Sequence, residues 1–155
     1  MKTFLTLFFL VLFTGGFAQK SKLVEIYRDP WYGAILYAGY FYDENNNLIS
    51  TAIYLNGPDS RYPHIGVSVY AFLGTPQDFF TFMNEVEEFV RENKPGFLKI
   101  IQDHPVSIDN PRQFSIYELK NKGNGCMYFN RKTLEKIKNK FIEYARANNI
   151  QFTGL

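Results

Sequence analysis

The sequence predicts an α+β fold: an antiparallel sheet of about five to seven strands, with two amphipathic helices at about 75–93 and 131–148 packed on one face. Two observations support this prediction. In both helical ranges apolar residues recur at spacings of three and four, whereas the other apolar stretches are short and alternate with polar residues. The strand-like stretches also come in groups before each helix, an order typical of α+β proteins.

The range 75–93 has the clearest helical pattern. Thr75 is suited to cap the helix N-terminus, Pro76 to occupy its first turn, and Asp78 to complete a capping box. The opposite face is acidic, which argues against binding to an anionic membrane. We expect the apolar stripe to face the core, and a groove-binding helix is the alternative. The stripe consists of Phe79, Phe82, Met83, Val86, Phe89 and Val90.

The range 131–148 predicts a second helix, capped by Asn130 and more basic on its outer face. Its narrower apolar stripe consists of Leu134, Ile137, Phe141, Tyr144 and Ala145. A shift of about 55 positions aligns the two helices and pairs Thr75 with Asn130, which suggests an internal repeat. The alternative is that two amphipathic helices resemble each other by composition alone.

The strands are predicted from alternation and from the turn residues between them. The first half offers 22–28, 33–42, 48–55 and 65–73, with an Asn-rich turn at 43–47 and a loop at 56–63. The second half offers short strands at 97–102 and 105–109, a clearer one at 113–119 and a last one at 126–129. A flexible loop is expected at 120–125, and the tail 150–155 is either a short strand or frayed.

Residues 1–18 have the pattern of a signal peptide. Lys2 precedes the apolar run 4–13, and small residues then lead to an expected cleavage between Ala18 and Gln19. The run is too short for a membrane anchor, since spanning takes about 20 apolar residues. We therefore expect an exported protein, periplasmic or extracellular and bacterial in style, with a single α+β domain at 19–155 and no stable membrane insertion after cleavage.

Charge and cysteine content narrow the function. After removal of Lys2, 16 basic residues face 15 acidic ones, and a balance this even points to no nucleic-acid partner. The single cysteine, Cys126, cannot form an internal disulfide. No GxGxxG, phosphate-binding loop or GxSxG motif is present, and no ligand cluster marks a metal site, so we expect no cofactor and no metal.

One catalytic alternative stays open. A small thiol hydrolase could use Cys126 as nucleophile and His104 or His64 as base, with Asp103, Asp109 or Asn110 as the orienting group. Nothing in the spacing of these residues favours it, and the sequence on balance indicates a protein without enzymatic activity.

Aromatic residues are the remaining unusual feature, and tyrosine and tryptophan are favoured where a surface binds a partner. The candidate ligand-binding residues are Trp31, Tyr40, Tyr42, Tyr54 and Tyr62. Alternation allows Tyr40, Tyr42 and Tyr54 to share one sheet face, although cross-strand packing would also explain them.

The sequence thus favours a small exported binding module. It would hold an unknown protein, peptide or glycan with its aromatic sheet face or the loop 56–63. An exported inhibitor or immunity-type protein, which blocks its partner with a charged surface, is the other non-catalytic alternative.

Overall fold

The computed structural model describes residues 20–62, 64, 66–118 and 125–153. The expected signal peptide at 1–18 lies outside these residues, as does nearly all of the expected loop at 120–125. In the described part of the chain, no helix has both the length and the apolar character needed to cross a bilayer.

The class is α+β, but the strands form two antiparallel sheets of four rather than one sheet of five to seven. The first sheet contains β1 (Ser21–Arg28), β2 (Ile35–Tyr42), β3 (Leu48–Pro58) and β4 (Ser68–Gly74), in that order. The second contains β5 (Leu98–Ile101), β6 (His104–Asn110), β7 (Gln113–Tyr117) and β8 (Cys126–Phe129), also in chain order. Helix α2 (Pro76–Glu92) follows the first sheet, and α3 (Arg131–Ala147) follows the second.

The separation of the sheets has a local cause. The chain that leaves β3 lies along the outer edge of β8, where the Ser60 N–H donates to the Cys126 carbonyl at 2.8 Å. The Ser60 hydroxyl also accepts from the Tyr128 N–H at 2.9 Å. Because this loop occupies the backbone edge of β8, β4 packs near β8 without joining it in a ladder. Strand patterns in the sequence do not reveal which segment takes up a free edge.

Both helices begin as the sequence predicts. The Thr75 hydroxyl accepts from the Asp78 N–H at 3.1 Å while the Asp78 carboxylate accepts from the Thr75 N–H at 3.4 Å, which forms the expected capping box. The Asn130 side chain accepts from the Thr133 N–H at 2.8 Å. Helix α3 ends at Ala147 with Asn148 as its C-cap, and the next residue, Asn149, has a φ of 53°, the left-handed conformation typical of the residue after a helix C-cap.

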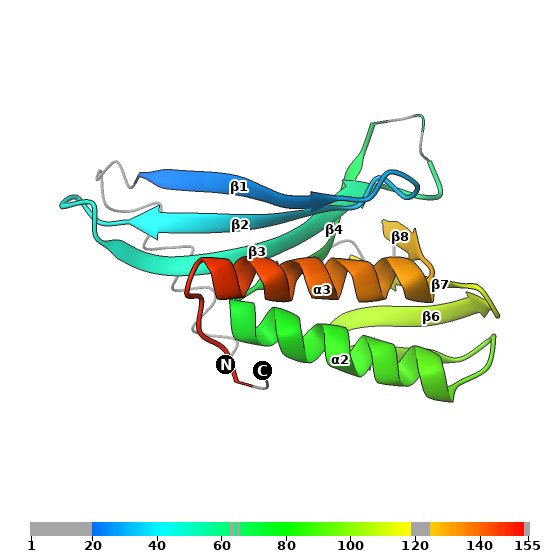
Figure 1. Ribbon diagram of the computed structural model, residues 1–155. Helices are drawn as coiled ribbons and strands as arrows, with labels where there is room; N and C mark the ends of the chain where they lie inside the picture. Colours follow the sequence, from blue (N-terminus) through cyan, green and yellow to red (C-terminus); the bar gives the residue numbers. More distant parts are fainter. Residues whose placement is uncertain (1–19, 63, 65, 119–124, 154–155) are drawn as a thin grey trace.

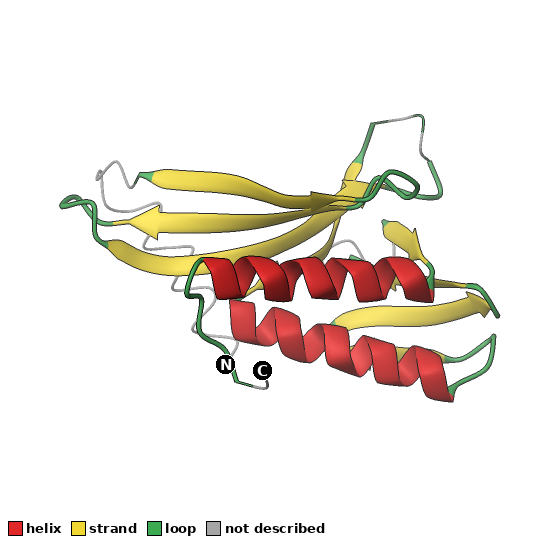
Figure 2. Cartoon of the chain, viewed as in Figure 1, coloured by secondary structure: helices red, strands yellow, loops and turns green. Residues whose placement is uncertain are grey.

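The apolar stripe of α2 faces the core, which confirms the expected orientation and leaves none of it for a groove. Helix α3 lies beside α2 and beneath the first sheet, and α2 also contacts β5 of the second sheet (Figure 1, Figure 2). Ring centroids of Phe79 and Phe82 lie 5.2 and 5.1 Å from that of Phe72 on β4. Phe141 of α3 lies 4.9 Å from Phe79. At roughly 1.5–3 kcal/mol for each buried side chain, this aromatic cluster joins the sheets and helices into one core.

The two halves are structurally alike. Each consists of four strands in sequential antiparallel order followed by a helix of 17 residues, and the N-caps Thr75 and Asn130 are 55 positions apart, as are the C-caps Asn93 and Asn148. Four buried positions also correspond at the same spacing: Phe79 with Leu134, Phe82 with Ile137, Val86 with Phe141, and Val90 with Ala145. The two halves therefore correspond in secondary structure and in helix burial.

An ion pair also joins the two helices, as the acidic outer face of α2 and the basic outer face of α3 suggest. Lys138 of α3 donates to the Glu87 carboxylate of α2, across the seam between the helices. A partly exposed pair of this kind contributes about 0–1 kcal/mol, so it orients the helices more than it stabilises them.

Candidate functional site

The turn between β1 and β2 is built around one buried carboxylate, that of Asp29. It accepts the N–H groups of Trp31 at 2.9 Å and Tyr32 at 2.6 Å, and the Tyr27 hydroxyl at 3.3 Å. The Asp29 backbone also bonds to Ala34 and Gly33 across the turn. With both ends of the turn fixed, the Trp31 side chain is displayed at the tip, and the residue is 87% exposed.

This turn is held to the rest of the fold at two further points. The Tyr32 hydroxyl accepts from the side-chain amide of Asn130, the N-cap of α3, at 3.2 Å. Gly33 has a φ of 67°, and a Cβ added there would lie 3.1 Å from the Pro58 ring. The turn therefore lies directly against the end of β3, where the next loop begins.

The loop after β3 is likewise organised by a buried aspartate. The Asp59 carboxylate accepts from the Arg61 backbone N–H at 3.0 Å and from its guanidinium at 3.2 and 3.0 Å. It also accepts from the Cys126 N–H at 3.5 Å. Burial by itself would raise the pKa of Asp59, but the hydrogen bonds from Arg61 and Cys126 outweigh it and hold the pKa below its ordinary value.

Tyr62 follows in this loop and is 55% exposed. Its N–H donates to the Asp59 carbonyl at 3.0 Å, and the Arg61 guanidinium lies 5.5 Å from the centre of its ring. The turn at 29–34 and the loop segment 59–62 lie at the same end of the first sheet, and we name them together the loop end (Figure 1). It brings two of the sequence-predicted binding residues, Trp31 and Tyr62, onto fixed neighbouring segments.

The other three predicted residues are divided between the two faces of the first sheet. The Tyr40 hydroxyl lies 2.6 Å from that of Tyr144 on α3, and both burial and this hydrogen bond raise the pKa of Tyr40. Alternation places Tyr42 on the same helix-covered side as Tyr40. Tyr54 points the other way, and its ring lies over Gly39, where an added Cβ would come within 2.8 Å. The expectation that these three tyrosines share one face is wrong.

Tyr54 belongs instead to an aromatic row on the uncovered face of the first sheet. In register it stands between Tyr37 on β2 and Leu73 on β4. Tyr70 and Leu23, 42% and 61% exposed, lie on the same face. Sequence reasoning did not nominate Tyr37 and Tyr70, because strand pairing and its bulges decide which residues share this face.

The structure places Cys126 and His104 on opposite faces of the second sheet. Cys126 is paired with Tyr117, one position away from the core pair Ile116 and Met127, so its side chain points away from the core. His104 packs on the core side, with its ring 5.4 Å from Phe82, and its Nδ1 lies 3.3 Å from the Tyr117 carbonyl.

The protonation of both groups also works against thiol catalysis. Burial raises the pKa of the Cys126 thiol to about 11, against a smaller opposing effect of Arg61. Burial lowers the pKa of His104. A neutral thiol and an imidazole on opposite sides of a sheet do not form a nucleophile and base pair, so this arrangement lends no support to the thiol hydrolase alternative.

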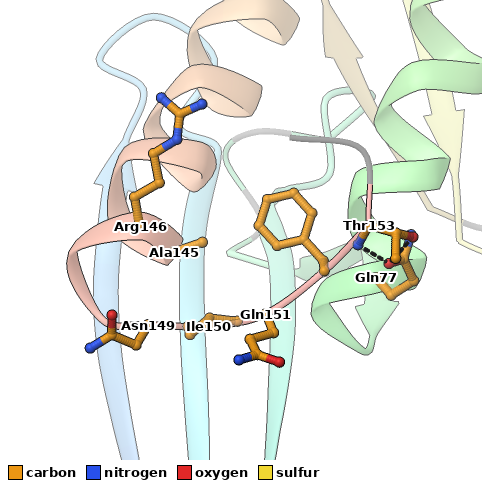
Figure 3. A pocket seen from close by; sticks show the side chains of 8 residues that line it. Gln77, Ala145, Arg146, Asn149, Ile150, Gln151 and Thr153 are labelled. Carbon is orange, nitrogen blue, oxygen red and sulfur yellow. Dashed lines mark hydrogen bonds between the residues drawn. The ribbon is translucent and has the colours of Figure 1, made fainter.

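One open hollow lies where the C-terminal tail crosses the helix ends (Figure 3). Gln77 of α2 accepts from the Thr153 N–H at 2.6 Å and from its hydroxyl at 2.9 Å. Phe152 packs against Phe80 and Phe141, and the described part of the tail, 150–153, is irregular chain and not a strand. Among the described residues, no three His, Cys, Asp or Glu side chains gather as metal ligands would.

Comparison with known proteins found no family model, no curated protein and no solved structure that matches this chain.

Proposed function

We propose that this protein is a small non-catalytic binding domain that recognises its partner with the loop end. The observation that carries the proposal is Trp31, a large apolar side chain 87% exposed on a turn that a buried aspartate fixes. Exposed tryptophan adds nothing to the core. Aromatic anchors on rigid supports are typical of binding hot spots, since little conformational freedom is lost when they bind.

The charges of the loop end favour a ligand that offers an apolar or planar surface. The Arg61 guanidinium is bonded to Asp59, so the segment presents the faces of Trp31 and Tyr62 more than it presents charge. A protein pocket, an extended peptide or a sugar ring would all supply such a surface. An inhibitor or immunity-type protein, which would block its partner with a charged surface, is the alternative proposal.

The test uses Trp31 both as the contact and as the reporter, because it is the only tryptophan in the chain. The tagged chain from 19 onward would be incubated with solubilised envelope of the producing cell, and captured material compared between the original protein and Trp31→Ala. We expect about a thirtyfold loss of affinity, the equivalent of one hot-spot residue. Emission from Trp31 should also move to shorter wavelength when purified partner is added.

Leu48→Ala is the matched control, because Leu48 is also exposed, at 53%, and begins β3 at its other end. Equal capture by all three proteins would refute the loop end as the binding surface. Loss of capture in both variants would assign binding to apolar surface in general.

We also propose that this binding takes place after export, which rests on the pattern at residues 1–18. Mass spectrometry of protein from the envelope should find a chain that begins at Gln19. Recovery of the full chain from the cytoplasm alone would contradict it.

A further inference from the structure

β5 is an edge strand whose outer backbone groups have no partner among the described residues. In register with β6 it pairs Lys99 with Val106 and Ile101 with His104, and the Phe97 carbonyl accepts from the Ile108 N–H at 2.9 Å. The odd-numbered positions therefore bond to β6. The alternate residues, Leu98 and Ile100, direct their N–H and C=O groups to the free edge, where no described segment pairs with them.

The side chains at the same edge are apolar and exposed. Phe97, Leu98 and Ile100 are 53%, 61% and 64% exposed. Leu98 and Ile100 share the face that points away from the helices, beside Ser107 and Pro105 of β6. An apolar edge with free backbone groups is the arrangement that natural sheets usually avoid.

The other edges of this molecule are protected. β1 carries Lys22, Glu25 and Arg28 and is interrupted by a bulge between Glu25 and Tyr27. The edge of β8 is bonded to Ser60, and β4 packs against that side of the second sheet. Among the described edge strands, β5 exposes two large apolar side chains together, Leu98 and Ile100, whereas β1 exposes one, Leu23, among its charged residues, and this points to a strand supplied from outside.

The charge of Lys99 selects the occupant. Lys99 is exposed between Leu98 and Ile100 and forms no ion pair with a described residue. If two copies paired antiparallel through β5, Leu98 of each copy would lie opposite Ile100 of the other. Lys99 of one copy would then lie directly opposite Lys99 of the other, and like charges opposite each other are destabilising. A foreign strand with an acidic residue opposite Lys99 removes this conflict.

We propose that β5 binds an extended segment of another protein by strand addition, and that this segment has apolar residues opposite Leu98 and Ile100 and a carboxylate opposite Lys99. Backbone hydrogen bonds would come from Leu98 and Ile100, and side-chain selection from the apolar–acidic–apolar pattern. This surface lies on the second sheet and does not depend on the loop end.

The probe is a short synthetic peptide that alternates valine with glutamate, measured by fluorescence anisotropy of a dye on the peptide. Two control peptides isolate the two contributions. One carries lysine in place of glutamate, and the other is N-methylated at each valine, which removes the donors that would pair with β5. We expect binding of the first peptide only.

Two substitutions test the site from the protein side. Ile100→Lys should weaken binding about tenfold or more, since it replaces a buried apolar contact with a charge. Lys99→Glu should reverse the preference, so that the lysine peptide binds and the glutamate peptide does not. Leu23→Lys on β1, 61% exposed compared with 64% for Ile100, should leave binding unchanged, and circular dichroism would check that each variant is folded.

Binding of the N-methylated peptide, or equal binding of the glutamate and lysine peptides, would overturn the proposal. Sedimentation equilibrium of the chain from 19 onward tests whether a second copy occupies the edge instead. A dimer that dissociates in the Ile100→Lys variant would assign the edge to a second copy and refute the proposal of a foreign strand. Because Trp31 is not in this surface, the Trp31→Ala variant should bind the peptide normally. The proposals for the loop end and for β5 can therefore be refuted independently of each other.

Discussion

The hydroxyl oxygens of Tyr40 on β2 and Tyr144 on α3 lie 2.6 Å apart, and one of them donates to the other. This contact joins the first sheet to the helix that follows the second sheet, 104 positions along the chain. Tyr40 therefore acts as a structural contact between the halves.

Replacement of Tyr40 by Phe should lower the free energy of unfolding by about 1 kcal/mol, the usual net value of one hydrogen bond. It should leave partner binding at the loop end unchanged. Urea unfolding followed by circular dichroism measures the first expectation and envelope capture the second. A large loss of capture with stability intact would return Tyr40 to the binding surface.

The same pair predicts a pH dependence. Burial and the bond to Tyr144 raise the pKa of Tyr40 above its ordinary value of 10.0, so the folded state holds this proton more tightly than the unfolded state does. The contribution to stability is therefore complete below pH 10 and is lost as the pH rises above it. The stability difference between the original protein and Tyr40→Phe should shrink above pH 10, and a constant difference would contradict the assignment.

Asp29 fixes the turn that carries Trp31. Asp29→Ala leaves the N–H groups of Trp31 and Tyr32 without their acceptor, and we expect a loss of about 1–3 kcal/mol together with a lower fluorescence anisotropy of Trp31. Asp43→Ala is the matched control, since Asp43 accepts from Asn45 and Asn47 in the exposed turn between β2 and β3. The control should leave Trp31 anisotropy unchanged, and equal effects of both substitutions would mean that the Trp31 turn is not held locally.

Asp59 should make the loop end sensitive to acid. Its pKa is held below the ordinary 3.8 because the hydrogen bonds from Arg61 outweigh the effect of burial. Its contribution is therefore present above about pH 3.8 and is lost as the pH falls through the lower folded value. Asp59→Asn should cost about 1–3 kcal/mol near neutral pH, since it replaces a buried carboxylate that accepts charge-assisted hydrogen bonds from Arg61. The cost should shrink in acid, as urea unfolding at pH 7 and pH 3 would show.

Cys126 should be unreactive while the protein is folded. Burial raises the pKa of its thiol to about 11, so at pH 8 almost none is present as thiolate. Reaction with an aromatic disulfide reagent should be slow and should accelerate with urea in parallel with unfolding. Fast labelling of the folded protein would restore the thiol hydrolase alternative, and Cys126→Ser would be the control that fails to react.

The helices, their caps and their buried faces follow from local pattern, and the structure agrees with the sequence on these points almost residue by residue. The turn at 43–47 is equally local, because Asp43 accepts N–H groups from its own neighbours and Asn46 adopts a φ of 62°. Such features depend on residues a few positions apart, so the linear sequence contains what is needed to predict them.

The candidate sites are a different matter. Trp31 and Tyr62 are recognisable in the sequence as aromatic residues in loops, but Asp29 and Asp59, which fix them, look like ordinary turn residues. Tyr40 and Tyr54 lie on opposite faces of the sheet because of the strand register, since a shift of one residue would move a side chain to the other face. The exposure of Leu98 and Ile100 depends on which strands lie at the sheet edges.

The sequence by itself determined the α+β class, the two capped helices with their buried stripes, and the order of the strands, since these result from periodicity and short-range hydrogen bonding. Only the tertiary structure decided that the strands form two sheets, that Cys126 and His104 lie apart, and that β5 is the outer strand of its sheet. These outcomes depend on pairing between distant segments, such as Ser60 with β8 and Tyr40 with Tyr144, and no local pattern specifies which distant partner a segment meets.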